Sequence, residues 1–155
     1  MNDRASGVLV VFEAGAHWPG WLGECSACAG GARVVVQQPG EACERFAGRV
    51  GERCEAIRSL GAGIELAVLA CGDRADAAGC DARRGMLTAL ADAMARTGGG
   101  RLYLTADTRQ RGAMRASLCD IARDITLEWQ KAGVTAGVRF GDGRMTIDKA
   151  NARVA

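Results

Sequence analysis

The length, composition and charge of the chain describe an ordinary globular protein and exclude several other classes. Its 155 residues fit one domain, 1–155 with a core over about residues 7–148, which is large enough to bury apolar side chains without metals or disulfides. A net charge of +2 without a basic stripe excludes nucleic acid and membrane surfaces as expected partners. No apolar run is long enough for a signal peptide or a membrane span, so we expect a cytoplasmic protein. The seven cysteines are odd in number and are expected to be reduced thiols.

Five apolar runs predict the strands of a sheet. Four are nearly continuous, as in strands buried on both faces, and the fifth alternates, with Val134, Ala136, Val138 and Phe140 on one side, as in an edge strand with one wet face. In chain order these runs are residues 8–12, 32–37, 64–71, 102–105 and 134–140.

The segments between the strands predict helices. Apolar residues recur at spacings of three and four over residues 42–60, 83–97 and 113–132, and glycines follow the last two segments. A shorter helix is expected with Pro19 at its first position. Residues 72–82 form the longest irregular connection, which predicts a binding loop or a surface excursion.

This alternation of strands and helices predicts the fold class. Strands joined through helices run parallel, and right-handed crossovers place helices on both faces. We therefore expect a three-layer α/β/α sandwich with a five-stranded, mostly parallel sheet, doubly wound and Rossmann-like. A turn at residues 141–143 predicts a short antiparallel strand over residues 144–147.

A polar or acidic residue follows each predicted strand, and the carboxyl ends of parallel strands share one rim where ligands bind. The ligand-binding candidates are Glu13, His17, Gln38, Asp73, Arg74, Asp107 and Arg109. Among them, Glu13, Asp73 and Asp107 have the oxygen ligands that Mg²⁺ prefers. The alternative is that these short polar side chains cap helices and turns.

Thiol chemistry has three candidate residues, Cys25, Cys28 and Cys80. The spacing of Cys25 and Cys28 fits a redox or zinc site, but no second metal-ligand pair lies nearby in the sequence. The alternative is that both are small buried hydrophobic residues. The glycine-rich phosphate-binding motifs and the G-x-S-x-G motif of hydrolases are absent from the sequence.

The five-strand, four-helix order over residues 7–140 resembles the universal stress protein family. As in that family, a short apolar strand is followed by an acid, here Glu13, at the position of the family's adenine contact, which is usually Asp. The stretch after the fourth strand, residues 107–112, lacks the spacing of the family's glycine-rich nucleotide motif. The resemblance therefore implies a regulatory or stress-response protein that does not hold ATP tightly.

Three functions follow as hypotheses. The first is a non-catalytic, universal-stress-protein-like module that forms a homodimer through its alternating last strand and binds an unidentified small molecule. The second is a small Mg²⁺-dependent enzyme that acts on a phosphorylated substrate at the acidic rim. The third is a thiol redox sensor. No cofactor is expected outside the second hypothesis.

Overall fold

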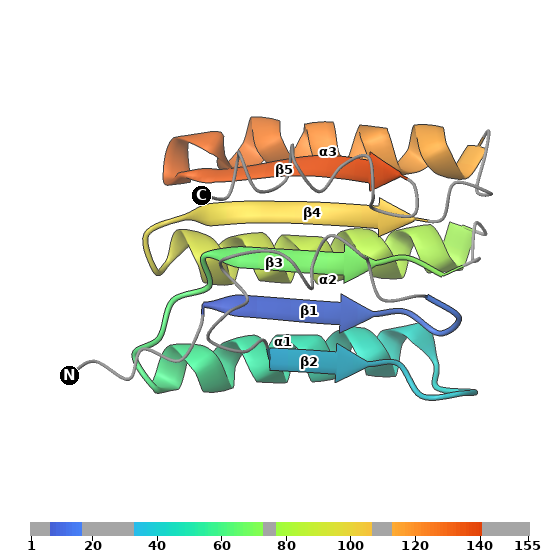
Figure 1. Cartoon of the computed structure of the whole chain (residues 1–155), viewed down its shortest axis with the longest axis horizontal. Coiled ribbons are helices and arrows are strands. Elements are labelled where there is room, and N and C mark those ends of the chain that lie inside the picture. The colour runs from blue at the N-terminus through green and yellow to red at the C-terminus, as the bar shows by residue number, and fades with distance from the viewer. Residues whose placement is uncertain (1–6, 17–32, 73–76, 107–112, 141–155) are drawn as a thin grey trace.

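The computed structural model describes residues 7–16, 33–72, 77–106 and 113–140, with side chains except at 77–80, 113–114 and 140. This part of the chain contains five strands, three α-helices and one short 3₁₀ helix (Figure 1). Their order is β1 (Val8–Phe12), β2 (Arg33–Val36), α1 (Cys43–Ser59), β3 (Leu66–Ala70), α2 (Ala77–Ala95), β4 (Gly100–Ala106), α3 (Ala113–Trp129), the short 3₁₀ helix η3 (Gln130–Ala132) and β5 (Val134–Phe140).

The strands form one sheet in the order β2-β1-β3-β4-β5, and every pair of neighbours runs parallel. In the register of β1, Val10 lies between Val34 of β2 and Val68 of β3. This is one of the two common orders of doubly wound sheets, and it confirms the Rossmann-like fold class. The predicted strand over residues 144–147 lies outside the described residues.

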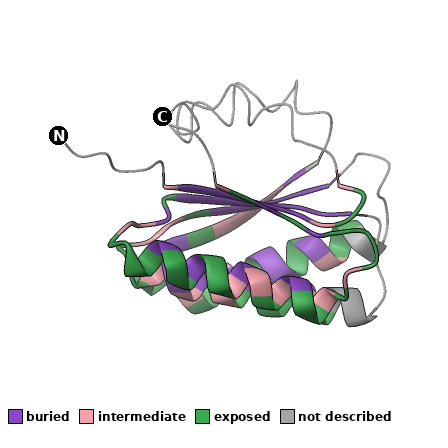
Figure 2. Ribbon diagram, turned by 90° about the horizontal axis from the view of Figure 1, so that it is seen from below, coloured by how far each residue is buried: buried purple, intermediate pink, exposed green. Residues whose placement is uncertain are grey.

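All three described helices pack on the same face of the sheet (Figure 2). The core between them combines β1 and β3 side chains such as Leu9 and Leu69 with the apolar stripes of the helices. The opposite face of the central strands is buried as well, since Val10 and Val68 are fully covered. Burial on both faces is what the continuous apolar runs predicted. The helix predicted to begin at Pro19 falls outside the described residues.

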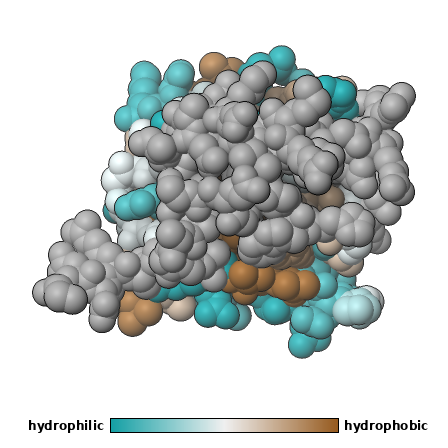
Figure 3. Space-filling view, in the orientation of Figure 1, coloured by the Kyte–Doolittle hydropathy of each residue, from teal (hydrophilic) through white to brown (hydrophobic). Residues whose placement is uncertain are grey.

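β2 departs from that prediction because it lies at the edge of the sheet. Its side chains alternate in burial, and Val34 and Val36 are 41% and 43% exposed. They coincide with an apolar area over β2 in Figure 3. The prediction that this strand is buried on both faces is wrong, because an apolar run does not distinguish a central strand from an edge strand.

Helix α2 begins earlier than predicted and shortens the expected 72–82 connection. It starts at Ala77, six residues before the predicted start. Alanine has the highest helix propensity, and Ala77, Ala78 and Ala82 allow the helix to begin well before its apolar stripe does. The predicted long loop is therefore wrong over residues 77–82, and residues 73–76 lie outside the described part.

The glycines after α2 stop the helix as predicted and allow a close backbone contact. Gly98 and Gly99 have φ angles of 105° and 92°, which favour glycine, and the Gly99 N–H donates to the Met94 carbonyl over 2.8 Å. A Cβ atom on Gly99 would lie only 2.5 Å from the Gly133 carbonyl oxygen, at the start of β5. The junction between α2 and β4 thus requires a residue without a side chain.

The alternation of β5 is confirmed on its helix-facing side, where Val134, Ala136 and Val138 pack against the core. The side chain of Phe140 is outside the description. The opposite side is not uniformly wet, because Arg139 is 7% exposed and its guanidinium lies 4.9 Å from the centre of the Tyr103 ring. Stacking on an aromatic face makes this burial of a charge tolerable.

Candidate functional site

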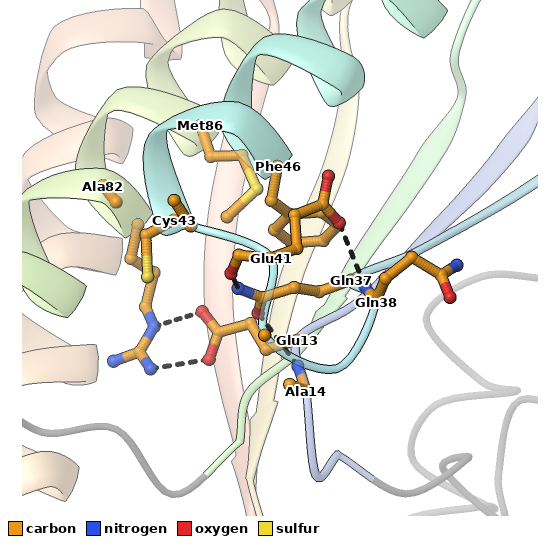
Figure 4. Close-up of a pocket in the computed structure, with 12 residues that line it drawn as sticks. Glu13, Ala14, Gln37, Gln38, Glu41, Cys43, Phe46, Ala82 and Met86 are labelled. Atoms are coloured by element: carbon orange, nitrogen blue, oxygen red, sulfur yellow. Dashed lines mark hydrogen bonds and ion pairs between the residues drawn. The ribbon is translucent and has the colours of Figure 1, made fainter.

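A cavity of about 480 Å³ lies at the carboxyl edge of the sheet, beside the point where the strand order reverses (Figure 4). Doubly wound sheets bind their ligands at this edge. The wall is built from the ends of β1 and β2, the start of α1 and the first turns of α2. It consists of Glu13, Ala14, Gln37, Gln38, Gly40, Glu41, Ala42, Cys43, Phe46, Ala82, Arg83 and Met86.

A buried ion pair at the cavity joins Glu13, directly after β1, to Arg83 of α2. The Arg83 Nε and Nη2 groups donate to the two carboxylate oxygens of Glu13 over 2.7 and 2.6 Å. The Arg83 side chain is 1% exposed and that of Glu13 is 11% exposed. Such a two-bond pairing fixes both side chains and compensates two buried charges. Glu13 is therefore held by the protein and is not a solvent-facing carboxylate.

The loop after β3 is joined to the same carboxylate. The Gly72 N–H donates to Glu13 over 2.9 Å, and a Cβ atom at position 72 would lie 2.2 Å from the Ala14 carbonyl oxygen. Only glycine allows the loops after β1 and β3 to approach this closely. Burial, and then the Glu13 carboxylate, raises the pKa of the neighbouring Cys71 thiol, so this thiol stays protonated at neutral pH.

The loop after β2 is held by a second set of bonds. The Gln37 amide oxygen accepts from the Ala14 N–H over 3.0 Å, and its nitrogen donates to the Glu41 carbonyl over 2.9 Å. The Glu41 carboxylate accepts from the Gln38 N–H over 2.9 Å and pairs with Arg49 over 2.6 Å. The backbone bond from Gln38, and then Arg49, lower the pKa of Glu41, so it is ionised at neutral pH.

The rest of the wall is apolar or backbone. Phe46 and Met86 approach each other across the cavity from α1 and α2, with Ala82 and the half-buried Cys43 beside them (Figure 4). No side chain caps the amino end of α1, where Ala42 precedes the first helical residue. The amino end of a 17-residue helix favours a hydrogen-bond acceptor or a negative charge. The cavity therefore offers an apolar surface with one polarised end.

Two of the predicted site residues are described, and both line this cavity: Glu13 and Gln38. The others lie outside the described part of the chain, namely His17, Cys25, Cys28, Asp73, Arg74, Asp107 and Arg109. Cys80 lies in α2, but its side chain is not described. The convergence of Glu13, Asp73 and Asp107 on a metal therefore stays a prediction.

Arg83 and Gln37 were not among the predicted site residues, although the sequence contains a signal for each. Arg83 stands at helical spacing from Met86, Leu87 and Leu90, which places a charged residue on a buried stripe. A buried arginine needs a carboxylate partner, and Glu13 directly follows a fully buried strand. Gln37 is the last residue of the predicted run 32–37 and the only amide within it, which marks it as a buried polar group at the rim.

Among the residues that the structure describes, no group of three or more His, Cys, Asp or Glu side chains could hold a metal ion. Across the same part of the chain, none of the helices has the length and apolar character needed to cross a membrane.

Comparison with known proteins supports the fold and nothing finer. No protein-family model matches the chain, and no curated protein matches it either. A solved structure that is similar is that of a protein from Burkholderia xenovorans named as a short-chain dehydrogenase/reductase. It has a TM-score of 0.51 and 15% sequence identity, and the match covers 97% of this chain and 82% of that one. The fold and the site thus define a Rossmann-like α/β protein with a cavity at its strand ends.

Proposed function

We propose that this protein is a non-catalytic binding module that holds a small molecule in the cavity beside β1, β2, α1 and α2. One observation carries the proposal. The carboxylates of Glu13 and Glu41 and the amide of Gln37, which line the cavity, are all bonded to other protein groups. General acid–base or metal chemistry requires groups that can reach a substrate, whereas these groups shape and stiffen the wall.

The wall also suggests the kind of ligand. A volume of about 480 Å³ suits a metabolite-sized molecule, with its apolar part against Phe46 and Met86. A carboxylate, phosphate or carbonyl group on the ligand would be favoured at the amino end of α1. The layout that resembles the universal stress protein family supports a regulatory or stress-response role for such binding.

A thermal-shift screen with metabolites, nucleotides and divalent cations tests the proposal. A ligand at about 100 times its Kd adds roughly 2.7 kcal/mol of stability. Each kcal/mol raises the Tm of a domain of this size by about 2–4 °C. The shift should disappear in Ala82→Leu, which fills the cavity, and should persist in Ala89→Leu, a matched substitution two turns along α2 and away from the wall.

Two results would contradict the proposal. One is a ligand whose stabilisation is the same in Ala82→Leu, Ala89→Leu and the unmodified protein, since it binds elsewhere. The other is Mg²⁺-dependent turnover of a phosphate ester that is lost in Glu13→Gln, which would support the enzyme hypothesis instead.

A further inference from the structure

A hydroxyl group from α3 occupies the outer edge of β5. The Ala136 N–H donates to the Thr126 Oγ1 over 2.9 Å, and the same hydroxyl donates to the Ala136 carbonyl over 3.2 Å. One hydroxyl thus bonds to both backbone groups of one strand residue.

These two backbone groups are among those that a further strand would use. In a parallel ladder the N–H and C=O groups of one residue point to the same side, and those of the next residue point to the other. The Gly133 carbonyl accepts from the Gly100 N–H on the β4 side. The backbone N–H and C=O groups of the odd-numbered residues of β5 therefore point towards β4, and those of Ala136 point outward. Thr126 therefore holds the middle of the outward edge.

The other edge of the sheet carries a comparable device. The Gln37 N–H donates to the Phe12 carbonyl of β1, so the backbone groups of Val36 and Gln38 point away from the sheet. The Val36 carbonyl accepts from Arg49 of α1 over 3.1 Å, and the Gln38 N–H donates to the Glu41 carboxylate. At each edge, a side chain from the covering helix bonds to an outward backbone group of the edge strand.

We propose that the Thr126 hydroxyl, by occupying the Ala136 backbone groups, prevents the β5 edge from pairing with the β5 strand of a second copy of this chain. The alternating pattern of β5 predicts pairing of copies at this edge, whereas the Thr126 contacts favour the opposite. Strand addition would have to break two hydrogen bonds within the protein before forming new ones. A second copy is the relevant partner because it presents an identical edge at the same concentration.

The test compares Thr126→Val, which removes the hydroxyl at nearly constant volume, with Thr126→Ser, which retains it. We expect the unmodified protein and Thr126→Ser to show no concentration-dependent association through β5 in light scattering. Thr126→Val should self-associate, and its Ala136 amide in dilute samples should exchange roughly 5- to 10-fold faster, since one hydrogen bond is lost. Val138→Pro in the Thr126→Val background removes an outward N–H and should reverse the association.

Two outcomes would overturn the proposal. The first is a Thr126→Val protein that stays folded, exchanges Ala136 faster and still does not associate, because an open edge would then attract nothing. The second needs no variant: in the unmodified protein, protection of the Ala136 amide that rises with protein concentration would show that β5 already pairs with a copy. Circular dichroism spectra of each variant establish that it is folded.

Discussion

At the scale of single residues, the pair of Glu13 and Arg83 dominates the site. It joins the end of β1 to α2 and, through the Gly72 N–H, to the end of β3. The three elements that meet at the switch point of the sheet are thus held by one carboxylate. Because both charges are buried, removing either partner leaves the other uncompensated.

Substitution of Arg83 by Met should lower the free energy of unfolding by about 3–5 kcal/mol, the usual cost of breaking a buried ion pair from one side. The neighbouring residue provides a matched control. Arg84 pairs with Asp124 over 2.9 Å, but these side chains are 47% and 48% exposed, so Arg84→Met should cost less than about 1 kcal/mol.

Urea denaturation measures both values. Equal effects for the two substitutions would show that the Glu13 pair is not a stabilising contact. The double substitution Glu13→Gln with Arg83→Met should recover part of the loss, because it removes the charge that is otherwise left unpaired.

The thiols provide a second prediction at this scale. Burial raises the pKa of Cys54 from 9.0 to about 11, and burial also raises the pKa of Cys71. The unfolded chain loses these thiol protons at a lower pH than the folded protein does. The contribution of the buried thiols to the free energy of unfolding is therefore complete below pH 9 and falls as the pH rises towards 11. Alkylation at pH 8 followed by peptide mass spectrometry should therefore modify the exposed Cys119 and leave Cys54 and Cys71 unmodified in the folded protein.

Modification of Cys54 or Cys71 at a rate similar to that of Cys119 would contradict this expectation. It would mean that α1 and the end of β3 open often enough to expose their thiols. Repeating the reaction in denaturant provides the control, since every cysteine should then react.

At the scale of elements, a glycine within α2 and a glycine just after it are expected to affect stability in opposite directions. Gly85 lies within the helix, and a Cβ atom there would meet nothing within 4 Å. Gly99 has a φ of 92° and lies against the Gly133 carbonyl. Helix propensity acts alone at the first position, whereas backbone conformation and space act at the second.

Gly85→Ala should therefore raise the free energy of unfolding by about 0.5–1 kcal/mol. Gly99→Ala should lower it by at least about 2 kcal/mol, from the left-handed conformation and the forced displacement of the β5 start. Thermal and urea unfolding of the two variants check both signs. A stabilising effect of Gly99→Ala would show that the contact between the β4 and β5 starts is not needed.

The elements themselves were largely predictable, because period and composition report local structure. The continuous run at 8–12 gave β1, and the alternation at 134–140 gave β5, with both bounds as observed. The early start of α2 was missed because alanines add helix propensity without an apolar stripe. The edge position of β2 was missed for a different reason: strand order is a property of the whole sheet, and the residues of one strand do not encode it.

At the scale of the whole molecule, the site was predictable in position but not in its bonding. That Glu13 lies at the rim follows from its place after a strand of a parallel sheet. Its partner Arg83 is 70 residues away, and such a pairing depends on how α2 crosses β1 and β3. The apolar part of the wall, Phe46 and Met86, was indistinguishable in the sequence from ordinary core residues.

The order of the strands also has a consequence for folding during synthesis on the ribosome. After β3, each described strand pairs with the one synthesised just before it, so β4 and then β5 can be added to a growing sheet as they emerge. Among the strands that the structure describes, only the step from β2 to β3 must pass over a strand already made. Once β1, β2 and β3 have come together, the remainder of the sheet can assemble vectorially, by short-range steps that need no rearrangement of what is already folded.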